Sequence, residues 1–209
     1  MRNDGNLFSW GEKNGNTCVT IDIGDEQIVD IAGGSFGFVG LTESGGLYAW
    51  GNGGLDPEFE VSGIQDIYSG SAMYAGIVDD GRIFSLTGLG PGQSVENGYI
   101  ESDRLAVDIV STPSTFLALN DDGTVISWAT QNRAQFEPNF LASTFGSNNE
   151  QIYANQSGFA SIKHDGSVIS VGMSGYRDEN SSPVYEYDLF DSNLGGEANR
   201  KAIDIASTY

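Results

Sequence analysis

The sequence feature that most constrains the fold is a short phrase that recurs along the chain at intervals of about forty residues. Its first copy, at residues 4–11, reads D-G-N-L-F-S-W-G, and its second, at residues 44–51, reads S-G-G-L-Y-A-W-G. Three further copies begin at Asp80, Asp122 and Asp165. The second position of every copy is a glycine, called here the turn glycine: Gly5, Gly45, Gly81, Gly123 and Gly166. These glycines define five repeat units.

A second phrase, called here the marker phrase, precedes the first. It reads I-V-D-I at residues 28–31 and returns at 64–67, 106–109, in degraded form at 150–152, and at 202–205. The interval from its last isoleucine to the turn glycine is 14 residues in four units (31 to 45, 67 to 81, 109 to 123, 152 to 166). A constant spacing within units, with variable spacing between them, is typical of a repeated supersecondary element.

The local chemistry of each unit favours β-strands. An Asp-Gly or Ser-Gly pair between apolar runs predicts a hairpin, and we expect a type I′ turn there. An aromatic residue follows the marker isoleucine by seven positions in four units: Phe38, Tyr74, Phe116 and Phe159. The apolar residues fall on both faces, which is typical of strands buried on both sides, and helical periodicity is absent. Weaker fourth strands are predicted at 17–21, 58–61 and 184–187.

Four antiparallel strands repeated every forty residues predict an all-β fold, a β-propeller of five four-stranded blades forming a single domain over residues 1–209. The chain begins with the end of a unit and ends with the start of one, so the two termini together would complete one blade. The tail and the head supply about five residues too few for its second strand. A closed ring with a defective blade is the favoured interpretation; a fragment of a longer array, or an edge that pairs with another chain, stays open.

The phrases at residues 28–34 (I-V-D-I-A-G-G) and 41–51 (L-T-E-S-G-G-L-Y-A-W-G) resemble the regulator-of-chromosome-condensation repeat. This family includes the propeller-type β-lactamase inhibitor proteins. The resemblance implies a propeller, although the family usually builds seven blades. Its members exchange nucleotides on small GTPases, bind chromatin, or inhibit an enzyme through one face. A histidine that many members carry is here Gly37, Met73 or Thr115, so no functional residue is carried over.

The charge of the chain restricts its partners. Nine basic and 29 acidic residues give a formal net charge of −20, which repels nucleic acid and disfavours an anionic membrane surface. We therefore expect a protein partner with a basic patch, no nucleic acid and no membrane insertion. No signal peptide or membrane-spanning segment is recognisable, so the expected location is the cytoplasm or a virion or surface assembly. The oligomeric state is left open.

The sequence contains no pattern that predicts catalysis, a cofactor or a metal site. His164 lies beside a turn, and Cys18 is the only cysteine, so structural roles are expected for both. The recurring Asp-Gly pairs supply turns rather than calcium loops. The repeated marker aspartates are interpreted as exposed strand residues or as hydrogen-bonding residues between blades. The equivalent tryptophans at 10, 50 and 128 are interpreted as packing residues.

One segment departs from the repeat. The marker isoleucines are 36, 42, 43 and then 53 residues apart, so about ten extra residues lie between Gly172 and Ile203. Tyrosines mixed with acids on a long loop favour a protein contact, because aromatic anchors supply most of the energy of an interface. The candidate binding residues are Tyr176, Arg177, Tyr185, Tyr187 and Phe190. The loop covering the closing blade is an equal alternative, and a cation held by Asp178, Glu179, Asp188 and Asp191 is a weaker one.

The sequence thus predicts a non-enzymatic protein-interaction or structural module, with a virion or cell-surface assembly as one possible setting. The alternative is a soluble inhibitor or regulator of an enzyme or GTPase that binds through one face of the propeller.

Overall fold

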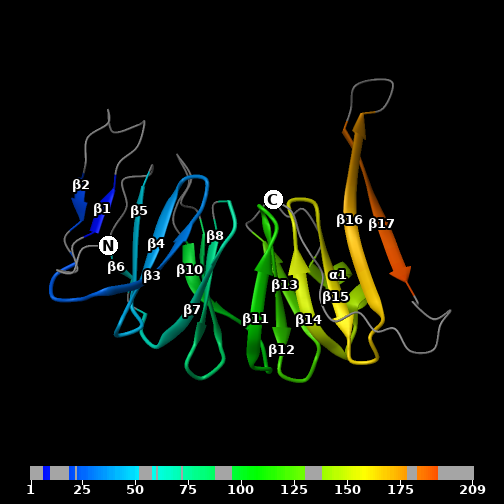
Figure 1. Ribbon diagram of the computed structural model, residues 1–209, viewed down its shortest axis with the longest axis horizontal. Coiled ribbons are helices and arrows are strands. Elements are labelled where there is room, and N and C mark those ends of the chain that lie inside the picture. Colours follow the sequence, from blue (N-terminus) through cyan, green and yellow to red (C-terminus); the bar gives the residue numbers. More distant parts are fainter. Residues whose placement is uncertain are drawn as a thin grey trace. The chain divides into compact units, whose positions relative to one another are not determined.

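The structure is a computed structural model of the 209-residue chain (Figure 1). It describes residues 7–9, 19–21, 23–51, 58–59, 61–71, 73–87, 96–129, 138–177 and 183–192. The chain divides into two compact units, residues 1–103 and residues 104–209, which are described separately. The prediction of one domain over the whole chain stays a prediction. Among the described residues no helix is long and apolar enough to cross a membrane.

The first unit consists of small antiparallel sheets. β1 (Leu7–Ser9) and β2 (Val19–Ile21) form a two-stranded sheet. The next sheet has the order β3 (Ile28–Gly33), β4 (Gly37–Thr42), β5 (Leu47–Gly51) and β6 (Glu58–Phe59). The third has the order β7 (Ile64–Ser69), β8 (Met73–Val78), β9 (Ile83–Thr87) and β10 (Glu96–Ile100). The strands of the two four-stranded sheets thus follow chain order, as the repeat predicts.

The second unit repeats this plan with one change. β11 (Ala106–Ser111), β12 (Thr115–Asn120) and β13 (Val125–Ala129) form a three-stranded sheet, followed by the helix α1 (Pro138–Phe145). The last sheet has the order β14 (Asn149–Ala154), β15 (Gly158–Lys163), β16 (Val168–Arg177) and β17 (Pro183–Ser192). The fourth strands predicted near 17–21, 58–61 and 184–187 are confirmed as β2, β6 and part of β17.

The hairpin turns are confirmed, but the predicted type I′ geometry is wrong. In the first turn, Gly45 N donates to Thr42 O at 3.0 Å and Thr42 N donates to Gly46 O at 3.0 Å. Within this turn only Gly45 has a positive φ, of 77°. This is a four-residue turn closed by a left-handed glycine, which bulges the following strand. The same bond pair and positive φ recur at the other described turn glycines: Gly81, Gly123 and Gly166.

Each marker strand carries a β-bulge at the same place. In β3, Ile28 pairs with Thr42 and Asp30 pairs with Leu41, so residue 29 is extra. The equivalent shift occurs in β7, β11 and β14. The carboxylates of Asp30 and Asp108 each accept a hydrogen bond of 2.8 Å from the next backbone N–H. The marker aspartate therefore stabilises the irregular strand locally.

The helix α1 contradicts the expectation of a chain without helices, and it takes the position after β13 where a fourth strand was predicted. Leu141 and Phe145, one helical turn apart, are 0% and 1% exposed and pack into the core. Pro138 begins the helix, and Gly146, with φ of 58°, ends it through a bond from its N–H to Ala142 O of 2.9 Å. The ammonium group of Lys163 donates to the carbonyl oxygens of Phe145 and Ser147.

Each unit has its own apolar core between two successive sheets. In the first unit, one face of β3–β5 (Ala32, Val39, Leu41, Leu47, Ala49) is buried against β7–β9, including Ile64, Tyr74 and Leu86. In the second unit, Leu117, Leu119 and Val125 are buried against Ile152, Phe159 and Val171. A sheet thus covers one face of its predecessor with its own first three strands. This is the arrangement of successive propeller blades.

The number of blades stays a prediction. The described residues contain three four-stranded sheets, one three-stranded sheet with a helix, and the two-stranded sheet of β1 and β2. The predicted closing blade depends on residues 1–6 and 193–209, which lie outside the described residues.

Candidate interaction surface

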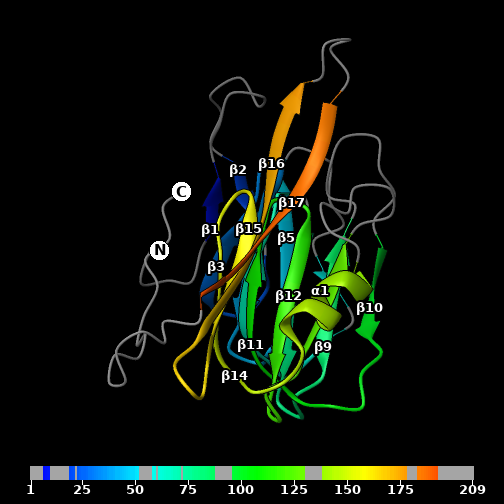
Figure 2. The same ribbon diagram turned by 90° about the vertical axis from the view of Figure 1, so that its right-hand side faces the viewer.

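The most distinctive element of the second unit is the long hairpin of β16 and β17. The two strands pair over ten residues, from Val168 with Ser192 to Arg177 with Pro183. β15 pairs with β16 only as far as Gly172. From Met173 onward the hairpin is therefore two-stranded and extends past the sheet (Figures 1 and 2). The segment interpreted as a long loop is strand over residues 173–177 and 183–192, and the fourth strand predicted at 184–187 lies within it.

The hairpin brings together some of the predicted binding residues and separates others. Tyr187 pairs with Met173 and Tyr185 with Gly175, which places both tyrosines on one face by strand alternation. Arg177, two positions beyond Gly175, falls on that face too. Tyr176 falls on the opposite face, and Phe190 pairs with Ser170 inside the four-stranded part. Three of the five candidates, Arg177, Tyr185 and Tyr187, therefore share one face of the projecting part.

The strand register argues against the weaker alternative, a cation site formed by four acidic residues. Asp188 pairs with Gly172 and Asp191 pairs with Ile169, so strand alternation places the two aspartates on opposite faces of the sheet. Asp178 and Glu179 lie outside the described residues. Within the described part of the chain, no group of three metal-ligating side chains is found.

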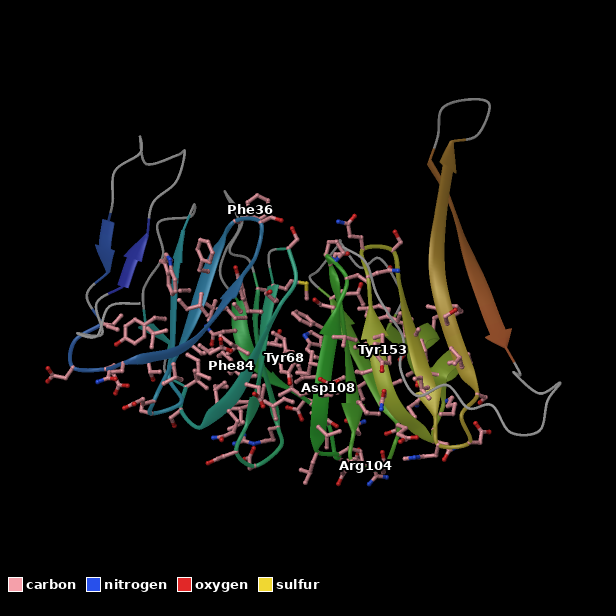
Figure 3. All side chains as sticks on the ribbon, in the orientation of Figure 1. Phe36, Tyr68, Phe84, Arg104, Asp108 and Tyr153 are labelled. Atoms are coloured by element: carbon pink, nitrogen blue, oxygen red, sulfur yellow. The ribbon has the colours of Figure 1, made fainter. Side chains whose placement is uncertain are left out.

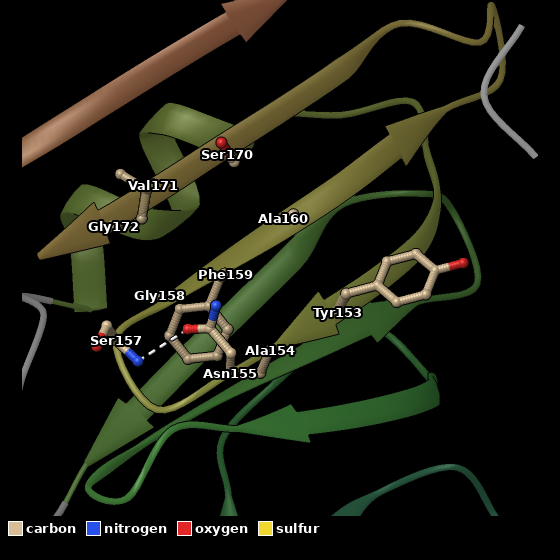
Figure 4. A pocket seen from close by; sticks show the side chains of 10 residues that line it. All are labelled: Tyr153, Ala154, Asn155, Ser157, Gly158, Phe159, Ala160, Ser170, Val171 and Gly172. Atoms are coloured by element: carbon tan, nitrogen blue, oxygen red, sulfur yellow. Dashed lines mark hydrogen bonds between the residues drawn. The ribbon is translucent and has the colours of Figure 1, made fainter. Parts of the chain in front are cut away.

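The last sheet has a second feature, a shallow pocket of about 200 Å³ on the face turned away from the core of its unit (Figure 4). Tyr153, Ala160 and Ser170 lie in register across β14, β15 and β16 on this face. Gly158 and Gly172, also paired, extend the lining. Small residues thus occupy the centre of this face, called here the outer face of the last sheet.

A fixed turn borders the pocket. Ser157 N donates to Asn155 Oδ1 at 2.8 Å, and Asn155 N donates to Gly158 O at 3.1 Å. These bonds close the connection between β14 and β15 without strand pairing, as in an Asx-turn. At Gly158 an added Cβ would lie 2.2 Å from Val171 O, so only glycine fits beside β16. The pocket is therefore bounded by backbone of defined geometry. Sequence reasoning missed it, although glycines at both 158 and 172 were a signal.

The first unit exposes apolar side chains that the sequence did not single out. Phe38 is 42% exposed and stacks on Trp50 at a ring distance of 5.7 Å, whereas Tyr74 and Phe159, at the equivalent place, are 1% and 2% exposed. Trp128 stacks on Phe116 at 5.2 Å. Trp50 and Trp128 are both buried, which confirms their predicted packing role, and Trp10 lies outside the described residues.

The aspartate carboxylates at the hairpin turns form hydrogen bonds within the turns. Asp122 Oδ1 accepts bonds from Thr124 N (3.0 Å) and Thr124 Oγ1 (2.6 Å), and these bonds, with Arg104 at 2.8 Å, lower the pKa of Asp122. Arg104 is labelled in Figure 3. Asp80 is bound by the backbone and guanidinium of Arg82, which lowers its pKa. The prediction that these aspartates serve turns is confirmed.

The single histidine has no catalytic surroundings in the described structure. His164 is exposed in the last described turn, and its Nδ1 lies 3.5 Å from Glu150 Oε2. Its backbone N–H donates to Asn148 O at 3.1 Å. These contacts fit the predicted structural role. Cys18 lies outside the described residues.

Comparisons with known proteins agree with this fold. The model of the regulator of chromosome condensation (RCC1) repeat matches residues 28–55. No curated protein matches the sequence closely enough to count as a relative. Residues 28–55 span the marker phrase, β3, β4 and β5, so the repeat resemblance predicted from the sequence is confirmed.

Solved structures share the fold at low sequence identity. Prp20p of Saccharomyces cerevisiae matches with a TM-score of 0.55 and 14% identity, over 91% of this chain and 60% of that one. A structure of Kap60 bound to yeast RCC1 (Prp20) gives 0.53 and 16%, over 80% and 52%. Human WBSCR16 gives 0.51 and 15%, over 75% and 50%. The chain spans about half of these structures, and the all-β propeller fold is confirmed.

Proposed function

We propose that this chain, which carries an RCC1 repeat at residues 28–55, is a non-enzymatic protein-interaction module. The observation that supports the proposal is the projecting hairpin of β16 and β17, in whose register Arg177, Tyr185 and Tyr187 hold positions of one strand face. Tyrosine and arginine are the residue types most often found at the centres of protein interfaces. The two-stranded ribbon continues from a four-stranded sheet, so these positions have a defined strand register.

The partner that fits this chain is a protein with a basic patch. A net charge of −20 raises the association rate with a positively charged surface and repels nucleic acid. Two similar structures support a protein partner: yeast RCC1 (Prp20) was solved bound to Kap60, and Prp20p was studied for its binding to Gsp1p and histones. Within this class we propose a place in a virion or cell-surface assembly.

The second candidate is a soluble inhibitor or regulator of an enzyme or GTPase. The fold favours it, because propeller sheets can present one face to a folded partner. The two candidates differ in the state of the native protein: a monomer that reduces the activity of a purified enzyme supports the second and contradicts the assembly role. A chain recovered only in a large particle supports the first.

The test of the hairpin begins with capture of the partner from the source organism, followed by binding measurements with both purified proteins. The triple variant Arg177→Ala, Tyr185→Ala, Tyr187→Ala should raise the Kd at least tenfold. The control, Tyr176→Ala with Glu186→Ala, changes the opposite face and should leave the Kd within about threefold. Equal affinities for the triple variant and the native chain would show that the hairpin is not the binding surface.

A further inference from the structure

The pocket on the outer face of the last sheet has a counterpart in the first unit. By the repeat, Gly158 and Gly172 hold the positions of Gly37 and Gly51. Gly37 pairs with Gly51 across β4 and β5, and Gly158 pairs with Gly172 across β15 and β16. Neither Gly37 nor Gly158 has room for a Cβ, which would lie 2.5 Å and 2.2 Å, respectively, from a carbonyl oxygen of the neighbouring strand. The backbone of the two places is therefore built alike.

In the first unit a tyrosine of the covering sheet fills this place. Tyr74 on β8 is 1% exposed, and it is buried in the same core as Ala32 and Val39. Its hydroxyl donates a bond of 2.6 Å to Gly37 O, which also accepts a bond of 2.9 Å from Gly34 N. The carbonyl group of Gly37 thus has two donors, one from its own turn and one from the tyrosine.

The last sheet has the same carbonyl group and the same turn bond. Gly158 is buried, and Gly158 O accepts a bond of 3.1 Å from Asn155 N. A carbonyl oxygen can accept two hydrogen bonds. The residues that take the repeat positions of Ala32, Val39 and Ala49 are partly exposed and line the pocket of about 200 Å³ (Figure 4): Tyr153, Ala160 and Ser170. Among the described residues, the place that corresponds to the tyrosine ring is therefore a pocket.

The sheet of β11–β13 shows the same place with an aromatic residue that has no hydroxyl. There the repeat position of Tyr74 is Phe159, which is buried, and Thr115 stands in the place of Gly37. Thr115 O accepts a bond of 2.9 Å from Thr112 N and one of 3.4 Å from Thr112 Oγ1, so the turn itself supplies both donors. The last sheet has glycine at this position, as does the sheet that receives a tyrosine. Its pocket therefore resembles the tyrosine site.

One residue of the pocket differs from the tyrosine site. Asn155 takes the place of Gly34, where an added Cβ would lie 2.7 Å from the hydroxyl of Tyr74. A phenol bound in the pocket therefore has to shift by part of an ångström from the place of Tyr74. Bonds between hydroxyl and carbonyl oxygens extend to about 3.0 Å, so a bond that is 2.6 Å in the first unit has room to lengthen.

We propose that this pocket binds the side chain of a tyrosine from a protein partner. The phenol donates a hydrogen bond to Gly158 O, and the ring lies on Ala160 and Ser170. A side chain of a folded partner fits better than a free metabolite, because the pocket is shallow and smaller than the roughly 300–1,000 Å³ of small-molecule sites. The inference goes beyond the proposed function: the pocket and the projecting hairpin are different parts of the last sheet, so either can fail without the other.

An NMR titration of the full ¹⁵N-labelled chain tests the proposal without knowledge of the partner. The probes are N-acetyl-tyrosine amide and N-acetyl-phenylalanine amide, which differ only in the phenol hydroxyl. The tyrosine probe should shift the backbone amide signals of Asn155 and Gly158 saturably, with a Kd at least threefold lower than that of the phenylalanine probe. Equal Kd values for the two probes, or unshifted signals at both residues, would overturn the proposal.

Variants that fill the pocket give the second readout. Ala160→Leu should raise the Kd of the tyrosine probe at least tenfold, and Ser170→Leu makes the same test at a second position should Ala160→Leu not fold. The matched control is Ser143→Leu, which adds an exposed leucine on α1 at a residue that does not line the pocket. An unchanged Kd in a folded pocket variant would contradict the proposal. Pocket signals that shift with protein concentration alone would assign the pocket to a second copy of the chain and overturn it too.

Discussion

The hydroxyl of Tyr74 on β8 donates a hydrogen bond of 2.6 Å to the carbonyl oxygen of Gly37 on β4. A buried side chain of one sheet thus binds the backbone of the sheet before it. Tyr74 is 1% exposed, and at this position the other described repeats have phenylalanine. Burial raises its pKa from 10.0 to about 12, although a bond from the backbone of Gly34 acts in the opposite direction.

Removing that hydroxyl should weaken the first unit. Tyr74→Phe removes one of two hydrogen bonds to the carbonyl oxygen of Gly37, which also accepts a bond of 2.9 Å from Gly34 N, and the loss should cost about 0.5–1.5 kcal/mol of the free energy of unfolding. Urea unfolding followed by fluorescence measures the change. Tyr99→Phe, at a residue that is 44% exposed, is the control and should change stability by less than about 0.5 kcal/mol. Equal effects of the two substitutions would contradict the role of the bond.

The same tyrosine makes stability depend on alkaline pH. Its pKa is higher in the folded state than the ordinary value of 10.0, so the folded state favours the protonated form. Its contribution is complete below pH 10 and is lost as the pH rises from 10 toward 12. Stability curves of the native chain and Tyr74→Phe should therefore converge over that range. Parallel curves would show that Tyr74 does not titrate as inferred.

The helix α1 should be essential for the core of the second unit. Leu141 is fully buried among Leu117, Phe159 and their neighbours, so Leu141→Ala leaves a cavity and should cost about 2–5 kcal/mol of the free energy of unfolding. Ser143→Ala on the exposed side of the helix is the matched control. Thermal and urea unfolding compare the two. A cost below about 1 kcal/mol for Leu141→Ala would mean that the helix does not pack as described.

Asn149 and Ser161 form a buried hydrogen-bonded pair in the last sheet, and their contributions to the free energy of unfolding should be coupled. Asn149 bonds to Gly123 O at 2.8 Å and accepts a bond of 2.7 Å from Ser161 Oγ. At these two positions the first two four-stranded sheets have isoleucine with glycine, and an added Cβ at Gly40 would lie 2.9 Å from Ile28 Cδ1. Asn149→Ile alone should therefore destabilise the chain, by about 2 kcal/mol or more.

The double-mutant cycle decides that prediction. Adding Ser161→Gly to Asn149→Ile removes both the clash and the hydroxyl that has lost its bond to residue 149, so it should restore at least about 1 kcal/mol. Ser161→Gly alone should be destabilising, because it breaks the bond to Asn149. Purely additive effects of the two substitutions would contradict the coupling of this pair.

The turn carboxylates should make the chain sensitive to acid. The bonds from Thr124, and then Arg104, hold the pKa of Asp122 below its ordinary value of 3.8. A lowered folded-state pKa contributes stability above pH 3.8 that is lost as the pH falls below it. Asp122→Asn should therefore be less stable than the native chain at pH 7 and should show a weaker loss between pH 4 and pH 2. An unchanged acid profile would contradict this.

The repeat arithmetic predicted the strands because the 14 residues from the marker isoleucine to the turn glycine contain regular pairs and a connection of constant length, and the bulge of the marker strand lies before them. The turn type was harder to predict from the sequence, because an Asp-Gly pair suits both a two-residue turn and a longer turn with a left-handed glycine. The hydrogen bond from Thr42 N to Gly46 O shows that the turn is the longer one. The helix was missed because its pattern is short, although Pro138, Leu141, Phe145 and Gly146 together mark its ends and its buried side.

The candidate surface was predicted in part. The alternation of Tyr185 and Tyr187 with acidic residues is typical of a strand, and it predicted the strand at 184–187; the loop interpretation of the surrounding residues gave too much weight to the length of the insertion. Which candidates share a face depends on register, and register follows from the pairing of Gly172 with both Gly158 and Asp188. The pocket depends on residues from three strands and could not be read from one segment.

The substitution of a helix for the fourth strand beside β13 has a consequence for solubility. An uncovered strand edge offers free amide and carbonyl groups to other chains, and such edges seed aggregation. In this sheet α1 contacts β13, the outermost described strand, and its Leu141 and Phe145 are buried in the apolar core. A helix packed against β13 hinders the approach of another strand, so substitutions that loosen α1 should increase aggregation of the chain.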